Sequence, residues 1–170
     1  MPSSRAIDTL RHGHFGPLIA LIVLAFCLFP GTASHAAPAK VVDDFPRSAL
    51  EIRSHRGRQW FNVRIADTDA RQELGLMFVT ALPADEGMLF PQPQPRVMSM
   101  WMKNTYIPLD MLFIDSHGRI VCLLANTRPQ SLDILSCPKP AKAVLEIGGG
   151  EAAERGIRVG DRVIHATFVR

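Results

Sequence analysis

The stretch LDMLFIDSHGRIVCLL, residues 109–124, decides the fold of this sequence. Its two apolar runs, at 111–114 and 120–124, would place hydrophobic side chains on both faces of an extended chain. Strands of this kind lie at the centre of a sheet that is covered on both sides. His117 and Gly118 provide the turn between the two runs. The stretch therefore predicts two central strands of a fully covered sheet.

Shorter patterns on either side of this stretch predict the rest of the domain. Apolar and polar residues alternate at 50–53 and at 60–65, around a turn at Gly57, which is typical of a hairpin. Prolines between 91 and 95 limit the next strand to 88–90. Further strands are expected at 97–103, 144–147 and 162–169, and short helices at 69–74 and 151–155. Together they predict an α+β fold: a compact, strongly curved, mostly antiparallel and barrel-like sheet with two short helices.

Residues 1–36 have the features of a secretory signal peptide. Arg5 and Arg11 give the N-terminal end a positive charge, and the twelve residues 18–29 are apolar and uncharged. The small residues of Ser34-His35-Ala36 fit a signal-peptidase site, so cleavage is expected after Ala36. A helix needs about 20 apolar residues to span a bilayer, which disfavours the alternative of an uncleaved anchor. We therefore expect a periplasmic or secreted protein without stable membrane insertion after cleavage.

The remaining chain has the size of one domain. Residues 37–47 are small and polar with prolines, which predicts a flexible tether, and residues 48–170 are expected to form a single globular domain. Without residues 1–36 the chain keeps 17 basic and 15 acidic residues, which are interspersed along it. This balance argues against nucleic acid as a partner. We expect a monomer whose partner is a small molecule or another envelope protein.

Cys122 and Cys137 are a candidate disulfide pair in an oxidising compartment. A disulfide needs their Cα atoms within about 7 Å. Cys122 lies in the middle of an apolar strand, whereas Cys137 lies in a proline-rich loop. The sequence leaves both a disulfide and two free thiols open.

Lys103, Asn104, Thr105 and Asp110 form the main candidate site, with Trp101 as the wall of a cleft. They lie at the ends of two successive predicted strands, where binding groups often gather. They could equally form a structural turn in which the amide and carboxylate bond to the backbone. A hydrolase or transferase in which Lys103 activates Thr105 beside Asp110 is the catalytic alternative. We expect an exported, non-catalytic ligand-binding or accessory domain.

Two further residue types need an interpretation. Met98, Met100 and Met102 share one face of the strand predicted at 97–103, and thioethers are ligands for Cu(I). Methionine is also an ordinary filler of irregular cores, and this interpretation is preferred. Trp60 and Trp101 are both expected to be buried. No cofactor and no metal ion are expected.

Six motifs in one order carry a resemblance to a known family. They are Gly75-Leu76-Met77, Gly87-Met88-Leu89-Phe90, Met100-Trp101-Met102-Lys103-Asn104-Thr105, Ile107-Pro108-Leu109-Asp110, Val144-Leu145-Glu146 and Gly156-Ile157-x-x-Gly160-Asp161. Over residues 48–169 the sequence resembles the family known as domain of unknown function 192, or uncharacterised protein family 0127. The resemblance implies a compact, sheet-rich domain that is often exported, and it carries no agreed activity. Leu74 and Val79 depart from the pattern, in which basic residues are common at these two positions.

Overall fold

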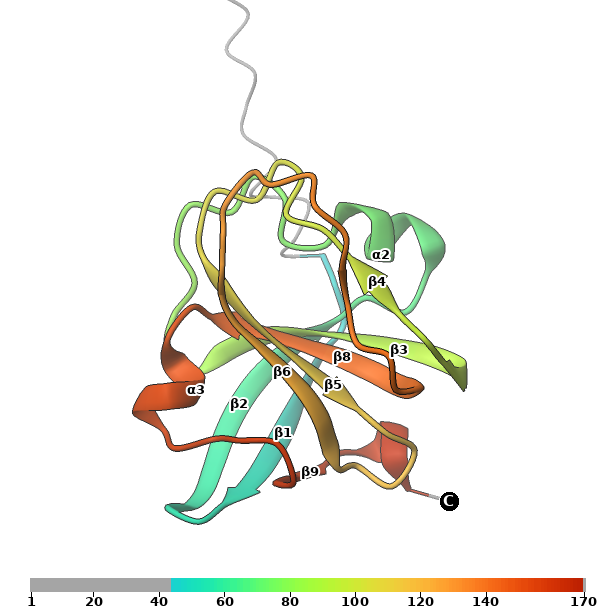
Figure 1. The fold of residues 1–170 in the computed structure, drawn as a ribbon, viewed down its shortest axis with the longest axis vertical. Helices are drawn as coiled ribbons and strands as arrows, with labels where there is room; N and C mark the ends of the chain where they lie inside the picture. Colours follow the sequence, from blue (N-terminus) through green and yellow to red (C-terminus); the bar gives the residue numbers. More distant parts are fainter. Residues whose placement is uncertain (1–43, 170) are drawn as a thin grey trace, which may run out of the picture. The chain divides into compact units, whose positions relative to one another are not determined.

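Residues 44–169 are described in a computed structural model, and most of their strands join one seven-stranded sheet (Figure 1). Its strands are β1 (Arg47–Ser54), β2 (Gly57–Ile65), β3 (Glu86–Arg96), β5 (Leu109–Ile114), β6 (Ile120–Thr127), β8 (Ala141–Gly148) and β9 (Arg162–Ile164). They lie in the order β6-β5-β8-β3-β2-β1-β9. All neighbouring strands pair antiparallel except β2 and β3, which are parallel.

The two edges of this sheet meet, so that it curls into a barrel-like form. The amide of Val163 donates a hydrogen bond to the carbonyl of Gly118 at 2.7 Å, and the amide of Ile120 donates to Asp161 at 3.0 Å. Gly118 has φ +77°, and a Cβ atom there would lie 2.4 Å from the Val163 carbonyl oxygen. A glycine is therefore required where the edges touch. The α+β, barrel-like fold expected from the sequence is confirmed.

Both faces of β5 are covered, as its apolar run predicts. The prediction of a central, fully covered strand at 120–124 is wrong, because β6 is an edge strand of the sheet and residues 121–124 are only partly buried. The inner face packs the side chains of Leu112 and Ile114 against residues from β1, β2 and β9. The outer face packs Met111 and Phe113 into a second cluster. All four side chains are fully buried. The sheet therefore supports a separate hydrophobic core on each side.

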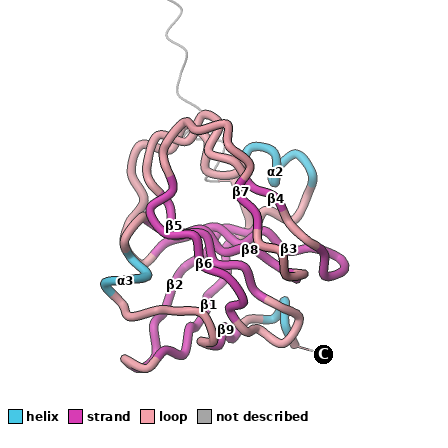
Figure 2. The backbone as a smooth tube through the Cα atoms, viewed as in Figure 1, coloured by secondary structure: helices cyan, strands magenta, loops and turns pink. Residues whose placement is uncertain are grey.

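The outer face is covered by α2 (Asp69–Leu74) and by a small second sheet of β4 (Ser99–Met100) and β7 (Leu135–Ser136). In Figure 2 these elements lie together, beside the long loops that connect them. The structure joins Cys122 of β6 to Cys137 in a disulfide, with Cα atoms 6.1 Å apart. This covalent link ties the segment after β7 to the main sheet. The second helix, α3 (Glu151–Glu154), follows β8 and buries Ala152 against the inner core.

Three predicted strand boundaries are wrong. β3 continues through the prolines that were expected to end it. Its register with β8 shifts between Pro91 and Arg96, so this part of the strand does not pair continuously. Prolines are tolerated there because they interrupt no regular ladder of hydrogen bonds. The strand predicted at 97–103 is reduced to β4, whose short partner β7 pairs with only two residues. The last strand ends at Ile164 and is followed by a 3-10 helix, η1 (Ala166–Phe168).

The predicted tether overlaps the described residues only at 44–47. There Phe45 is buried in the outer core, with the Arg71 guanidinium 5.5 Å from its ring centroid, and β1 already begins at Arg47. The expected signal peptide and its cleavage site lie outside the described residues. Among residues 44–169, the structure has no helix that is both long and apolar enough to cross a membrane.

Candidate functional site

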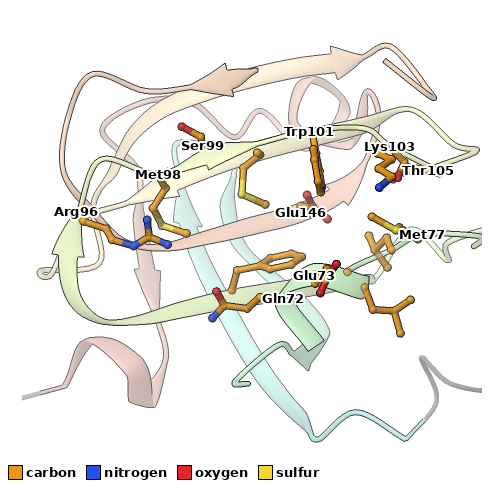
Figure 3. Close-up of a pocket in the computed structure, with 15 residues that line it drawn as sticks. Gln72, Glu73, Met77, Arg96, Met98, Ser99, Trp101, Lys103, Thr105 and Glu146 are labelled. Carbon is orange, nitrogen blue, oxygen red and sulfur yellow. The ribbon is translucent and has the colours of Figure 1, made fainter. Parts of the chain in front are cut away.

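A pocket of about 370 Å³ lies on the outer face of the sheet, between α2, β4 and the strands β3 and β8 (Figure 3). Its walls are mainly apolar and include Leu76, Phe90, Met98 and Met100. Its polar lining groups are Gln72, Glu73, Arg96, Ser99, Lys103, Thr105 and Glu146. Concave sites with apolar walls and a few polar groups are typical of small-molecule binding.

Glu146 lies at the floor of the pocket because of the alternation of β8. Leu145 and Ile147 point into the inner core, so Glu146 points to the outer face. Its register partners on the two adjacent strands are Met88 and Met111, both fully buried. The carboxyl group is therefore flanked by apolar side chains on both neighbouring strands.

The Glu146 carboxyl has no partner within residues 44–169. Glu146 is only 4% exposed, and its carboxyl makes neither a hydrogen bond nor an ion pair with the described residues. Burial raises the pKa of Glu146 to about 8. A carboxylate without a compensating charge is costly in such surroundings, so the group is mostly protonated at pH 7. Buried polar groups are normally satisfied. The Glu146 oxygens are not among the fully enclosed side-chain atoms of residues 44–169 that lack a hydrogen bond, so they open onto the space of the pocket.

The positive groups at the pocket are engaged elsewhere. Arg96 Nε donates to Gln92 Oε1 at 2.9 Å, and Gln92 Nε2 donates to Gln72 Oε1 at 3.0 Å. The Lys103 ammonium lies 5.1 Å from the centroid of the Trp101 ring, in a cation–π contact. Neither cation forms an ion pair with Glu146.

Helix α2 ends against the pocket through Gly75. Thr68 caps the start of the helix by accepting a hydrogen bond from the Arg71 amide at 3.3 Å. Gly75, at the other end, has φ +47°, and a Cβ atom there would lie 3.3 Å from the Phe90 ring. The glycine thus lets the chain turn directly over Phe90 and leads Leu76 and Met77 into the pocket wall.

The structure brings only part of the predicted site together. Trp101, Lys103 and Thr105 line the pocket. Asn104 stands behind the wall, where its side-chain amide donates to the Met77 sulfur at 3.8 Å and its carbonyl accepts from the Phe78 amide at 2.8 Å. The Thr105 hydroxyl is buried and donates to the Lys103 carbonyl at 3.4 Å.

Asp110 lies on the opposite face of the sheet from the pocket. It is fully buried, and its carboxylate accepts hydrogen bonds from the amides of Asn126 at 2.8 Å, Gly150 at 3.0 Å and Ala152 at 2.9 Å. Asp110 is therefore bonded to these amides and lies apart from Lys103 and Thr105, with which the sequence grouped it. Asp110 pairs in register with Ile147, whereas Met111 pairs with Glu146, so strand alternation separates the two carboxyls. Asp110 holds the turn before α3 instead.

The methionines and tryptophans also differ from the expectations. Met98 and Met100 line the pocket, but Met102 is fully buried and its sulfur accepts a hydrogen bond from the Thr127 hydroxyl at 3.1 Å. The three thioethers therefore do not share one cavity. Within residues 44–169, His, Cys, Asp and Glu form no group of three suited to a metal ion. The expected burial of the tryptophans is wrong, since Trp60 is 56% and Trp101 is 46% exposed.

Glu146 is the residue that sequence reasoning missed. It appeared only as the last member of a motif, although one signal was visible: an acidic residue between Leu145 and Ile147 in an apolar strand. An acidic side chain in a covered central strand must be paired, protonated or exposed to a cavity. Glu146 is both protonated at pH 7 and open to a cavity, and the cavity depends on α2 and β4, which come from other parts of the chain.

Comparison with known proteins identifies the family of this domain. Residues 51–165 match the model of the family domain of unknown function 192, described as "Uncharacterized ACR". The chain belongs to this family. Motifs that carry the resemblance meet at the pocket, through Gly75–Met77, Phe90, Met100, Trp101, Lys103, Thr105 and Glu146. The family signature therefore describes the pocket as much as the sheet.

Two solved structures have the same fold as this family member. One is a protein from Sinorhizobium meliloti 1021 proposed to be a transcription regulator, with 35% identity and a TM-score of 0.70, covering 72% of this chain and 96% of that one. The other is a protein of unknown function from Novosphingobium aromaticivorans DSM 12444, with 39% identity and a TM-score of 0.68, covering 70% of this chain and 85% of that one. No curated protein matches the chain.

Proposed function

We propose that this domain is a non-catalytic binding domain that takes a small organic molecule into the pocket above Glu146. The observation that carries this proposal is a buried carboxyl without a partner at the floor of a pocket of about 370 Å³. An unsatisfied buried polar group is destabilising, and a ligand that pairs with it would remove that cost. A pocket with a shifted carboxyl pKa is a favourable candidate for a functional site.

Binding is favoured over the hydrolase or transferase alternative. That alternative needed Lys103, Thr105 and Asp110 in one cleft, and Asp110 belongs to the other face of the sheet. The Thr105 hydroxyl donates to a backbone carbonyl, and the Lys103 ammonium lies over Trp101. A nucleophile needs a base within hydrogen-bond reach, and this arrangement does not supply one.

The location outside the cytoplasm stays part of the proposal. The Cys122–Cys137 disulfide supports it, because disulfides persist in oxidising compartments. A role in transcription, proposed for the related Sinorhizobium meliloti protein, is not carried over. The helices α2 and α3 have six and four residues, which is short for a helix that reads the major groove.

The test is a thermal-shift screen of the exported protein against a library of small metabolites. Wild type is compared with Glu146→Gln, which keeps the shape of the side chain, and with Glu154→Gln, an exposed control on α3. We expect compounds that raise the Tm of wild type and of the control but not of Glu146→Gln. Compounds that stabilise all three proteins equally, or a library with no stabilising compound, would contradict the proposal.

A further inference from the structure

We propose that the ligand of this pocket is a small organic cation, an amine with an apolar body, whose ammonium pairs with the Glu146 carboxylate. The inference rests on the proposed binding function and names its ligand class. It follows from three features: the charges that lack partners, the chemistry of the walls, and the proton that Glu146 carries when the pocket is empty.

The unpartnered charges of the pocket are negative. Besides Glu146, Glu73 of α2 lines the pocket, and it too makes no hydrogen bond or ion pair within residues 44–169. In the view of Figure 3, Glu146 lies between Trp101 on one side and Glu73 on the other. Arg96 and Lys103 are exposed and already bonded to Gln92 and Trp101. The pocket therefore offers one buried and one exposed carboxyl to a ligand.

The walls suit a cation with an apolar body. Phe90, Met98 and Met100 provide aromatic and thioether surface around the carboxyl. Trp101 already holds one ammonium, that of Lys103, against its ring. Aromatic faces attract ammonium groups, and apolar walls desolvate the rest of an amine ligand. The same walls contain no positive group that is buried and could hold an anion at the floor.

Binding would exchange a proton for the ligand's charge. In the empty pocket Glu146 is mostly protonated at pH 7, because burial raises its pKa to about 8. The charged groups that face it are Glu73 from α2, Arg96 from β3 and Lys103 from the segment after β4, and its strand neighbours are apolar. When the ammonium enters, the Glu146 O–H bond breaks, its electron pair stays on the carboxylate, and the proton leaves to solvent. One proton is therefore released for each amine bound by the protonated form.

This exchange predicts the pH dependence of affinity. Only the ionised fraction of Glu146 pairs with the ammonium, so the association constant rises about tenfold per pH unit below pH 8 and levels off above it. The amine itself stays protonated through pH 8. An anionic or neutral ligand that accepts a hydrogen bond from protonated Glu146 would show the opposite trend.

The test is isothermal titration calorimetry with 2-phenylethylamine, 3-phenylpropionate and 2-phenylethanol, which share an aromatic body and differ in charge. Titrations at pH 6, 7 and 8, each in two buffers of different ionisation enthalpy, give the affinity and the number of protons released. We expect the amine to bind best, with about 50-fold higher affinity at pH 8 than at pH 6. It should release nearly one proton at pH 7. Glu146→Gln should bind it at least tenfold more weakly without proton release, and Glu154→Gln should behave as wild type.

If the propionate or the alcohol binds more tightly than the amine, with an affinity that falls from pH 6 to pH 8, the proposal of a cationic ligand is overturned. The proposed binding function would still hold. The same holds if the thermal-shift screen yields only neutral or anionic compounds that depend on Glu146. If no probe binds and no compound in the screen depends on Glu146, both the ligand class and the binding function are overturned.

Discussion

Asp110 and Glu146 are buried carboxyls on neighbouring strands of one sheet, one register position apart, and they differ in what surrounds them. Asp110 accepts hydrogen bonds from three backbone amides. Glu146 has no partner within residues 44–169, and a pocket opens in front of it. The first is a structural carboxylate that holds the turn before α3. Both carboxyls are buried, so burial does not distinguish them. The presence or absence of hydrogen-bond partners distinguishes the structural carboxyl of Asp110 from the candidate functional carboxyl of Glu146.

The largest expected effect is on how stability depends on pH. Glu146 has a pKa of about 8 in the folded protein against an ordinary value of 4.5, so the folded state binds more protons between these values. Its contribution is therefore fully present at low pH and is lost as the pH rises from about 5 to 8. Relative to wild type, Glu146→Gln should gain on the order of 4 kcal/mol in unfolding free energy between pH 5 and pH 9. Urea denaturation of both proteins across this range measures the difference.

A constant difference between the two proteins from pH 5 to pH 9 would contradict this account, because it would mean that Glu146 is ionised in the folded state, either hydrated or paired. Glu154→Gln, on the exposed side of α3, is the matched control and should follow the wild-type curve at every pH.

Asp110→Asn should be the next most damaging change. The new side chain turns one acceptor into a donor and faces the backbone amides of Gly150 and Ala152, which would lose a partner in a buried position. We expect a loss of about 2 to 3 kcal/mol in unfolding free energy at pH 7. Chemical denaturation measures it, with the exposed Asp85→Asn as control, which should change stability by less than about 0.5 kcal/mol. An Asp110→Asn protein as stable as wild type would mean that this carboxylate is not structural.

Lys103→Met should have the smallest effect on stability. The lysine is exposed and its ammonium contacts the Trp101 ring, so its loss should change the unfolding free energy by less than about 0.5 kcal/mol. Thermal denaturation in matched buffers is sufficient to measure this. A loss comparable with that of Asp110→Asn would show that Lys103 stabilises the fold and would contradict its assignment as an exposed side chain with little effect on stability.

The sequence predicts the sheet better than the site. The run at 111–114 correctly predicts a covered central strand, because burial on both faces is visible in the local composition. The similar run at 120–124 forms the edge strand β6, because the order of strands in a sheet is not a local property. The partners of Asp110 could not be predicted, since they lie 16, 40 and 42 residues away and are brought in by the pairing of β5 with β6 and β8. Glu146 was missed for a related reason. Its lack of a partner depends on how α2 and β4 cover the outer face, which no local pattern encodes.

The most direct test of this account is the pKa of Glu146 itself. Carbon-13 NMR of the side-chain carboxyl, followed from pH 4 to pH 10 and assigned with Glu146→Gln, reports the protonation of this one group. We expect a midpoint near 8, because burial without a partner raises the pKa. A midpoint near the ordinary value of 4.5 would show that the carboxyl is hydrated or paired. That result would contradict the claim that Glu146, at the floor of the pocket, is a buried carboxyl without a partner.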